Sequence, residues 1–291
     1  MNNITPTATS SIRAPAGVRL RQRLAEGRIL PAIGVYDIFS ATLAAQHAEA
    51  VFCSGYGFSA SFYGLPDEGF ITWTDMLHYV ERMRTVLPDT HIVVDIDDGY
   101  GDAAVAANVV RRLEAAGASA VIFEDQKRPK KCGHLPGKEI APLDDYLQRL
   151  KAVLDARTDL VVVARTDAEE FEEGLRRARA FTEAGADAVM VEGLVRPEQV
   201  IAVDQAVAKG AYVTVNLLQG GKTPPVTLTE LSRLGANLVI YSTPCLFAAH
   251  EAIDDALRRL TAADGKLASD FSRVDLKTSN AVLKRSGGRP S

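Results

Sequence analysis

A repeated junction between helix and strand is the feature of this chain that most constrains its fold. Residues 116–120, 184–188 and 234–238 each read as a helix that ends at a glycine and is followed at once by an apolar strand. Around each junction lie an amphipathic helix and a short apolar segment. A unit of this kind, repeated along one chain, predicts an α/β fold with a parallel sheet.

Eight segments have the length and the apolar composition of buried strands. They are residues 29–37, 50–54, 91–97, 120–126, 160–167, 188–193, 211–217 and 237–242. Apolar residues at helical spacing predict helices over 103–116, 143–154, 174–184 and 197–207, and further helices over 18–27 and 249–262. Eight such units within about 250 residues match the size of a (β/α)8 TIM-type barrel. A doubly wound open sheet is the alternative.

The chain reads as one domain with two tails, because no linker or change of composition divides it. We expect a disordered N-terminal tail over residues 1–15 and a barrel domain over 16–265. Residues 266–291 form a C-terminal tail, polar from Ser269, which we expect to fray or to contact a neighbouring subunit.

Composition excludes several classes of function. The net charge of -4 and the pI near 5.8 attract neither nucleic acid nor an anionic membrane. No apolar stretch approaches the roughly 20 residues of a membrane helix, and the N-terminus lacks the apolar core of a secretory signal. Three cysteines far apart in the chain favour reduced thiols, with Cys53 and Cys245 in the core. We expect a cytoplasmic protein.

Polar residues stand where several predicted strands end, which in such a barrel is the edge that carries the active site. Asp95 and Asp97 share one face of their strand, and their mutual repulsion calls for a cation. With Glu124 they predict a site for Mg²⁺, for which Mn²⁺ is a possible substitute. Later strand ends supply Arg165, Glu192 and Asn216. Each could instead be structural, Arg165 by pairing with Asp167; Asp98 and Asp102 are expected to cap the next helix.

The segment Lys130-Lys131-Cys132-Gly133-His134 follows the fourth predicted strand. A thiol beside cations should have a lowered pKa and could move protons or attack carbon. The alternatives are an incidental cysteine in a solvated basic loop, or two zinc ligands that lack a second pair. Residues 220–223, Gly-Gly-Lys-Thr, lack the first glycine of a phosphate-binding motif and predict a mobile loop.

Six motifs taken together resemble the isocitrate lyase / phosphoenolpyruvate mutase superfamily. They are residues 64–67, 95–97, 124–126, 130–134 and 164–167, and Asn216. The resemblance runs in order from about residue 30 to about residue 249. The Lys-Lys-Cys-Gly-His segment beside Glu-Asp-Gln is most similar to the lyases, in particular to methylisocitrate lyase.

The resemblance implies a (β/α)8 barrel that uses Mg²⁺ and a small 2-hydroxy or 2-oxo carboxylate. It also implies a homo-oligomer, a tetramer or dimer, in which subunits exchange their last barrel helix. By analogy Asp95 would bind Mg²⁺ directly, Asp97 and Glu124 would hold its water ligands, and Asp67 would lie behind them.

The same analogy assigns the remaining site residues. The substrate would be cleaved at a carbon–carbon bond in a retro-aldol step, and Cys132 would protonate the resulting enolate-like carbanion. His134 and Glu192 would tune the thiol, and Lys130 would lower its pKa, within a loop that closes over the substrate. Substrate contacts would come from Ser54, Gly55 and Tyr56 around one carboxylate, Arg165 as a bidentate clamp, Gly133 and His134, and Asn216 with Ser242 or Thr243 at the far end.

Three residues depart from the pattern of the lyases. Phe52 stands where many have tyrosine, Tyr56 where they have a small residue, and Gln219 where an acid is common. A substituted malate, or hydrolysis of oxaloacetate, therefore fits as well as isocitrate or methylisocitrate. Two other functions stay open: phosphonate P–C chemistry of the mutase or hydrolase type, and a non-catalytic barrel that binds a carboxylate.

Overall fold

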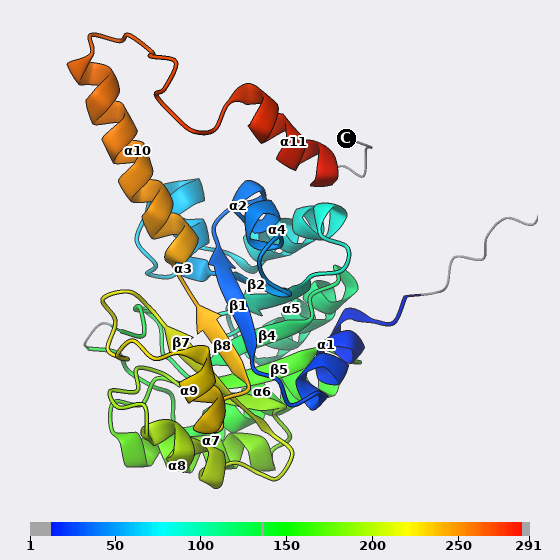
Figure 1. Cartoon of the computed structure of the whole chain (residues 1–291). Coiled ribbons are helices and arrows are strands. Elements are labelled where there is room, and N and C mark those ends of the chain that lie inside the picture. The colour runs from blue at the N-terminus through cyan, green and yellow to red at the C-terminus, as the bar shows by residue number, and fades with distance from the viewer. Residues whose placement is uncertain (1–12, 135–136, 287–291) are drawn as a thin grey trace, which may run out of the picture.

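The computed structural model describes residues 13–134 and 137–286, and its centre is a closed barrel of eight parallel strands (Figure 1). Each strand pairs with the next in sequence, and β8 closes the barrel on β1. The strands are β1 (Leu30–Val35), β2 (Ala50–Cys53), β3 (His91–Asp95), β4 (Ala120–Glu124), β5 (Val161–Thr166), β6 (Ala188–Val191), β7 (Tyr212–Leu217) and β8 (Leu238–Tyr241). The barrel prediction is confirmed, all eight strands lie within their predicted segments, and the open sheet is excluded.

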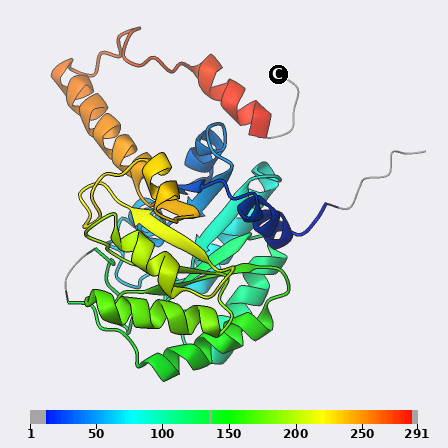
Figure 2. The same ribbon diagram turned by 60° about the horizontal axis from the view of Figure 1, so that its bottom comes forward.

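Helices surround the barrel as an outer layer (Figure 2). In chain order they are α1 (Ala16–Ala25), α2 (Ile38–Ala44), α3 (Gly55–Phe58), the π-helix η1 (Ser59–Tyr63), α4 (Trp73–Val86), α5 (Ala103–Ala115), α6 (Leu143–Ala156), α7 (Phe171–Glu183), α8 (Gln199–Ala206), α9 (Leu228–Arg233), α10 (Pro244–Ala262) and α11 (Leu276–Ser286).

Four helix starts differ from the prediction. α1 begins at Ala16 and not at 18, and α7 begins at Phe171 and not at 174. α8 begins at Gln199 and not at Pro197, because the Gln199 side chain accepts hydrogen bonds from the backbone N–H groups of Val195 and Arg196 and holds Pro197 in a turn. α10 begins at Pro244, five positions before the predicted 249, with proline in its first turn.

The glycines of the repeated junctions have the backbone conformation that ends a helix. Their φ angles are 92° at Gly117, 103° at Gly185 and 104° at Gly235, a region that side chains with a Cβ atom avoid. The glycine therefore ends each helix, and the chain continues directly into the next strand, which is β4, β6 or β8.

Alternate residues of each strand face the barrel interior. On β5, Val161 and Val163 pack in the interior, whereas Val162 and Ala164 pack against the outer helices. The N-terminal end of the interior is filled by α1, whose Leu20 and Leu24 are buried there. The C-terminal end is left for polar side chains.

The C-terminal helices leave the barrel. α10 projects away from it and buries none of its residues (Figures 1 and 2). The chain then returns as α11, whose Val282 lines a shallow cavity with Thr42 and Leu87 on the α2–α4 side. This part of the tail, which we expect to fray or to contact a neighbouring subunit, includes a helix, at whose start Asp275 accepts hydrogen bonds from the backbone N–H and the hydroxyl of Thr278.

In the described parts of the chain, no helix is long and apolar enough to cross a membrane. The predicted disordered tail falls mostly on residues 1–12, which lie outside the described residues, as does part of the predicted C-terminal tail, residues 287–291. The division into a domain with two tails stays a prediction.

Candidate active site

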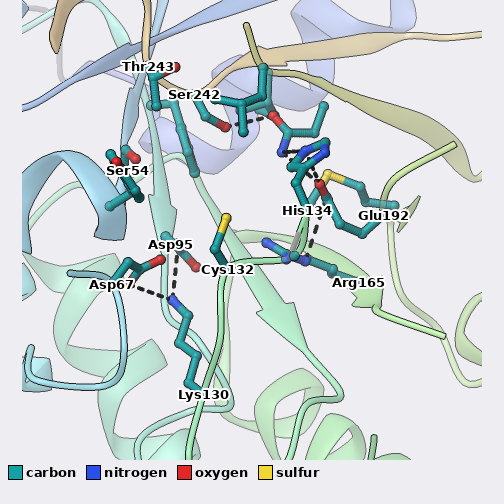
Figure 3. A pocket seen from close by; sticks show the side chains of 17 residues that line it. Ser54, Asp67, Asp95, Lys130, Cys132, His134, Arg165, Glu192, Ser242 and Thr243 are labelled. Carbon is teal, nitrogen blue, oxygen red and sulfur yellow. Dashed lines mark hydrogen bonds and ion pairs between the residues drawn. The ribbon is translucent and has the colours of Figure 1, made fainter. Parts of the chain in front are cut away.

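Most predicted site residues come two positions after an apolar interior residue of their strand, so they lie on the same face of that strand. Phe52, Val93, Ile122, Val163, Met190 and Ile240 are interior residues, and Ser54, Asp95, Glu124, Arg165, Glu192 and Ser242 follow two positions later. Of this second group, Ser54, Asp95, Arg165, Glu192 and Ser242 line one cavity together with Lys130, Cys132, His134 and Asn216 (Figure 3), whereas Glu124 is not among the lining residues. The cavity volume is about 50 Å³.

One side of this cavity is acidic. We call Asp67, Asp95, Asp97, Glu124 and the enclosed Lys130 the carboxylate side. The Lys130 ammonium is buried and pairs with Asp97, with Asp67 at 3.2 Å and with Asp95 at 3.9 Å. Burial acts to lower the pKa of Lys130, but the surrounding carboxylates, Asp97 first, outweigh it and raise that pKa well above its ordinary value.

The carboxylate side has more buried negative charge than Lys130 can balance. Within the described residues, both carboxylate oxygens of Glu124 are buried without a hydrogen-bond partner, although Arg165 Nη1 lies 3.4 Å from one of them. Burial raises the pKa of Glu124 well above its ordinary value and that of Asp97 to about 7. An unsatisfied buried carboxylate beside other acids suits a further cation.

Among the described residues, no three His, Cys, Asp or Glu side chains converge closely enough to ligate one ion directly. This arrangement is compatible with the expectation that a single carboxylate, Asp95, contacts the ion and the others act through water.

The opposite side of the cavity is a closed chain of hydrogen bonds and ion pairs. We call Cys132, His134, Arg165, Glu192 and Asn216 the thiol side. His134 Nε2 lies 2.7 Å from Glu192 Oε1, and Asn216 Nδ2 donates to the same oxygen at 2.9 Å. Within the thiol side, Cys132 is the residue nearest to Asp67 and Asp95 of the carboxylate side (Figure 3).

The Cys132 thiol does not have the lowered pKa that the sequence predicted. Burial raises its pKa, although the backbone N–H of His134 and the Arg165 guanidinium act in the opposite direction. The prediction that Lys130 lowers the pKa of the thiol is wrong, because its ammonium group faces Asp67 and Asp97 and forms ion pairs with them. The thiol is therefore a protonated group at neutral pH.

The His134 ring is held from two directions. Its Nδ1 accepts a hydrogen bond from the backbone N–H of Lys222 at 3.0 Å, so the proton is on Nε2, which faces Glu192. A Cβ atom on Gly221 would lie 2.8 Å from Nδ1, so only glycine allows this approach. Residues 220–223, predicted to be a mobile loop, thus contact the thiol side.

Arg165 is engaged by protein carboxylates. Its Nε and Nη2 donate to the two oxygens of Asp167 at 2.8 and 3.0 Å, so the alternative pairing considered from the sequence is present. The fork needed for a bidentate substrate clamp is therefore occupied in this conformation, leaving Nη1 beside Glu124. Burial alone would raise the pKa of Asp167, but Arg165 and Lys138 outweigh it and lower that pKa to about 2.

The residues predicted to receive a substrate carboxylate lie beside the carboxylate side. Ser54 caps α3 by accepting from the backbone N–H of Gly57. A Cβ atom on Gly55 would lie 3.0 Å from Asp95 Oδ2, which explains the glycine. Tyr56 lines the cavity and packs edge-on against Phe247 of α10, with ring centroids 6.2 Å apart.

Of the two residues predicted to cap the helix after the third strand, one caps it and the other does not. Asp102 caps α5 by accepting from the backbone N–H groups of Ala104 and Val105, as predicted. Asp98 does not cap this helix; it pairs with Arg128 at 2.7 Å.

Cys53 is a core thiol, but Cys245 is only half-buried because it lies in the first turn of the projecting α10.

Sequence reasoning missed several residues that line the cavity or hold its side chains in place. Met190 and Ile240 could have been found, since they occupy the inward positions before Glu192 and Ser242. Leu218, Lys138 and the backbone N–H of Lys222 had no signal in the sequence, because only the tertiary structure brings their loops over the barrel.

The chain matches a known family over most of its length. The model of the family described as phosphoenolpyruvate phosphomutase matches residues 20–261. Among curated relatives, 2,3-dimethylmalate lyase of Eubacterium barkeri is 34% identical over 245 residues, covering 81% of this chain and 83% of the relative. A 2-methylisocitrate lyase of Shewanella oneidensis is 37% identical over 245 residues, covering 81% and 82%.

Solved structures give the same answer. The crystal structure of 2,3-dimethylmalate lyase, a PEP mutase/isocitrate lyase superfamily member, has a TM-score of 0.85 and 31% identity, covering 95% of this chain and 92% of that one. The structure of phosphonopyruvate hydrolase in complex with oxalate and Mg²⁺ has a TM-score of 0.82 and 26% identity, covering 92% and 95%. The chain therefore belongs to the phosphoenolpyruvate phosphomutase family, within the PEP mutase/isocitrate lyase superfamily of lyases.

Proposed function

We propose that the protein is a Mg²⁺-dependent carbon–carbon lyase that cleaves a small 2-hydroxy or 2-oxo dicarboxylate. The observation that carries this proposal is the position of the half-buried Cys132 thiol, whose pKa is raised by burial, between an acidic cluster in need of a cation and the Arg165 guanidinium. A proton donor next to a cation site is what the cleavage of a carbon–carbon bond next to a carboxylate requires.

The residues of the carboxylate side fit Mg²⁺. Asp95 would contact the ion, and Asp97 and Glu124 would hold its water ligands, with Asp67 behind them. Glu124, whose buried oxygens have no hydrogen-bond partner in residues 13–134 and 137–286, gains most from such a charge. Bound there, Mg²⁺ would draw electron density from the oxygen atoms of a substrate.

The thiol side supplies the proton. A general acid must keep its proton until the carbanion forms, and the raised pKa of Cys132 ensures this. After transfer, the backbone N–H of His134 and the Arg165 guanidinium stabilise the thiolate. Glu192 holds the His134 ring by accepting a hydrogen bond from Nε2. We call residues 130–134 the thiol segment, and His134 with Gly133 keeps this segment against the substrate.

The pocket favours a substrate with few charges. Arg165 and Lys130, the cations of the cavity, are both paired with protein carboxylates. The backbone N–H groups at Ser54–Tyr56 can donate to one carboxylate, and the far end offers Asn216, Ser242, Met190 and Ile240. We therefore infer a dicarboxylate such as a substituted malate in preference to a tricarboxylate.

Incubation with a panel of candidate carboxylate substrates tests this function. Full-length protein is incubated with Mg²⁺ and with substituted malates, oxaloacetate, methylisocitrate, isocitrate and phosphonopyruvate, and keto-acid, oxalate and phosphate products are measured. Cleavage of a malate is the expected result. Consumption of phosphonopyruvate alone would establish P–C chemistry, and binding of diacids without any product would establish a non-catalytic barrel.

We further propose that subunits exchange α10 in a homodimer or tetramer. α10 buries no residue in its own chain, and Ile253 and Leu257, one helical turn apart, are each 59% exposed. On α2, Phe39 and Leu43 are 39% and 40% exposed at the same spacing. Apolar side chains left at the surface in this way indicate a partner surface.

Light scattering on the double variant Ile253→Asp/Leu257→Asp tests this exchange. The wild type is expected to be an oligomer and the variant a smaller species. A wild-type monomer would contradict the proposal.

A further inference from the structure

We propose that Lys138 is the positioning residue that holds Cys132 and His134 in the cavity. No sequence signal marked it, and it lies outside the two sides of the pocket defined above. Its side chain is 2% exposed, and its ammonium group donates to the backbone carbonyl of Gly133 and, at 3.1 Å, to Asp167 Oδ1. Lys138 thus joins the thiol segment to the end of β5.

The bond to Gly133 acts on both neighbouring side chains. Gly133 is buried between Cys132 and His134, so the place of its carbonyl sets the place of the thiol and of the imidazole. A Cβ atom on Gly133 would lie 2.6 Å from Glu192 Cγ and 2.8 Å from Asp167 Oδ1. The backbone is therefore pressed against the barrel wall, and Lys138 is the side chain that ties it there.

Two side chains of this segment have charged partners of their own, Lys130 in Asp97 and Asp67, and His134 in Glu192 at 2.7 Å, but these contacts hold side-chain ends and not the backbone. The backbone is also held at the start of the segment, by weaker bonds. The Gln126 amide donates to the Lys131 carbonyl at 3.0 Å and accepts from its N–H at 3.1 Å, which holds the start of the segment. These are bonds between neutral groups, whereas Lys138 makes charge-assisted bonds, which are about twice as strong.

Loss of the Lys138 ammonium would leave one of its two acceptors without a donor. Asp167 would keep Arg165, but the Gly133 carbonyl would lose its donor in a place where water is largely excluded. The segment regains hydrogen bonds by moving out to solvent. The expected consequence is an exposed Cys132.

Cysteine alkylation measures this directly. In the metal-free, full-length Lys138→Met variant, we expect iodoacetamide to modify Cys132 about 10-fold faster than in the wild type, a size that corresponds to one lost charged hydrogen bond. Loss of a positive charge alone would slow the reaction, since it disfavours the thiolate. A faster reaction with iodoacetamide would therefore show that Cys132 has become more exposed.

The chain offers matched controls. Lys131, on the same segment, donates to the Gly137 carbonyl at 2.7 Å in an exposed position, so Lys131→Met should react within twofold of the wild type. Lys138→Arg keeps a charged donor and should restore slow alkylation. Cys53, fully buried, should stay unreactive in every folded variant, as mass spectrometry of each cysteine shows.

Turnover gives a second readout, and only this part rests on the proposed function. With the best diacid of the panel, kcat of Lys138→Met should fall about 10- to 100-fold, while KM changes less than about threefold because the carboxylate side is intact. The alkylation result holds whether or not the lyase assignment does.

The proposal is overturned if Cys132 of Lys138→Met reacts at the wild-type rate, or if Lys131→Met accelerates it equally. Should alkylation of Cys53 show that the methionine variant unfolds, Lys138→Gln, which is too short to reach both acceptors, decides by the same measurement.

Discussion

The two sides of the pocket use buried charge in opposite ways. On the thiol side, Arg165, Asp167, Glu192 and His134 form a continuous chain of opposite charges and hydrogen bonds. On the carboxylate side, four acids surround the single ammonium of Lys130, and Glu124 has no hydrogen-bond partner among the described residues. A paired network is preformed and rigid, whereas an unpaired one is complete only after a ligand brings the missing charge.

The largest expected effect comes from removing the group between the two sides. Cys132→Ala should lower turnover of the cleaved diacid by roughly 10²–10⁴-fold, the usual contribution of a general acid. Stabilisation by Mg²⁺, measured as the shift in Tm, should stay unchanged because the carboxylate side is intact. Full turnover in the alanine variant would show that Cys132 is not the proton donor.

Asp95→Asn removes the residue proposed to contact Mg²⁺ and should affect only the carboxylate side. We expect kcat/KM to fall about 10²-fold, equivalent to about 2.7 kcal/mol, and the Mg²⁺-induced shift in Tm to disappear. Asp102→Asn is the matched control, since asparagine also caps a helix and α5 lies outside the cavity. If both variants lose the shift equally, Asp95 is not a metal ligand.

Two glutamates on the barrel edge, at the ends of β4 and β6, test the difference in pairing. Glu192→Gln disturbs the hydrogen bonds of Oε1 to His134 and Asn216, although Oε2 has no hydrogen-bond partner among the described residues, and should lower the free energy of unfolding of the metal-free protein by about 1–3 kcal/mol. Glu124→Gln removes an unsatisfied charge and should leave that free energy unchanged or raise it by about 1 kcal/mol. Urea denaturation measures both, and equal destabilisation would contradict the comparison.

The smallest effect is the pH dependence of metal binding. Burial raises the pKa of Asp97 from 3.8 to about 7 and raises that of Glu124 as well. A carboxyl whose pKa is raised by folding stabilises the folded state while protonated, and this contribution is lost as pH rises through about 7.

The Tm of the metal-free protein should therefore fall by a few degrees from pH 6 to pH 8. Mg²⁺ competes with these protons and should raise Tm more at pH 8 than at pH 6. Thermal scans with Mg²⁺ and with a chelator make the comparison, and a larger Mg²⁺ effect at pH 6 would count against this site.

Much of the candidate site could be read from the chain because strand geometry is periodic. Once β4 and β5 were placed, Glu124 and Arg165 had to point inward, two positions beyond Ile122 and Val163. The direction of a flexible side chain has no such rule. Lys130 is close to Cys132 in sequence, yet its ammonium lies among acids from two other loops.

The sequence by itself therefore determined the barrel, its glycine junctions and the acids and bases on its edge, since these depend on local spacing and on the repeat of two in a strand. The tertiary structure alone decided how the charges pair. It placed Lys130 away from the thiol, raised the pKa of Cys132 by burial, and brought Lys138 and the backbone of Lys222 onto the thiol segment. Pairing energies depend on burial and distance in space, and neither is encoded in the separation of residues along the chain.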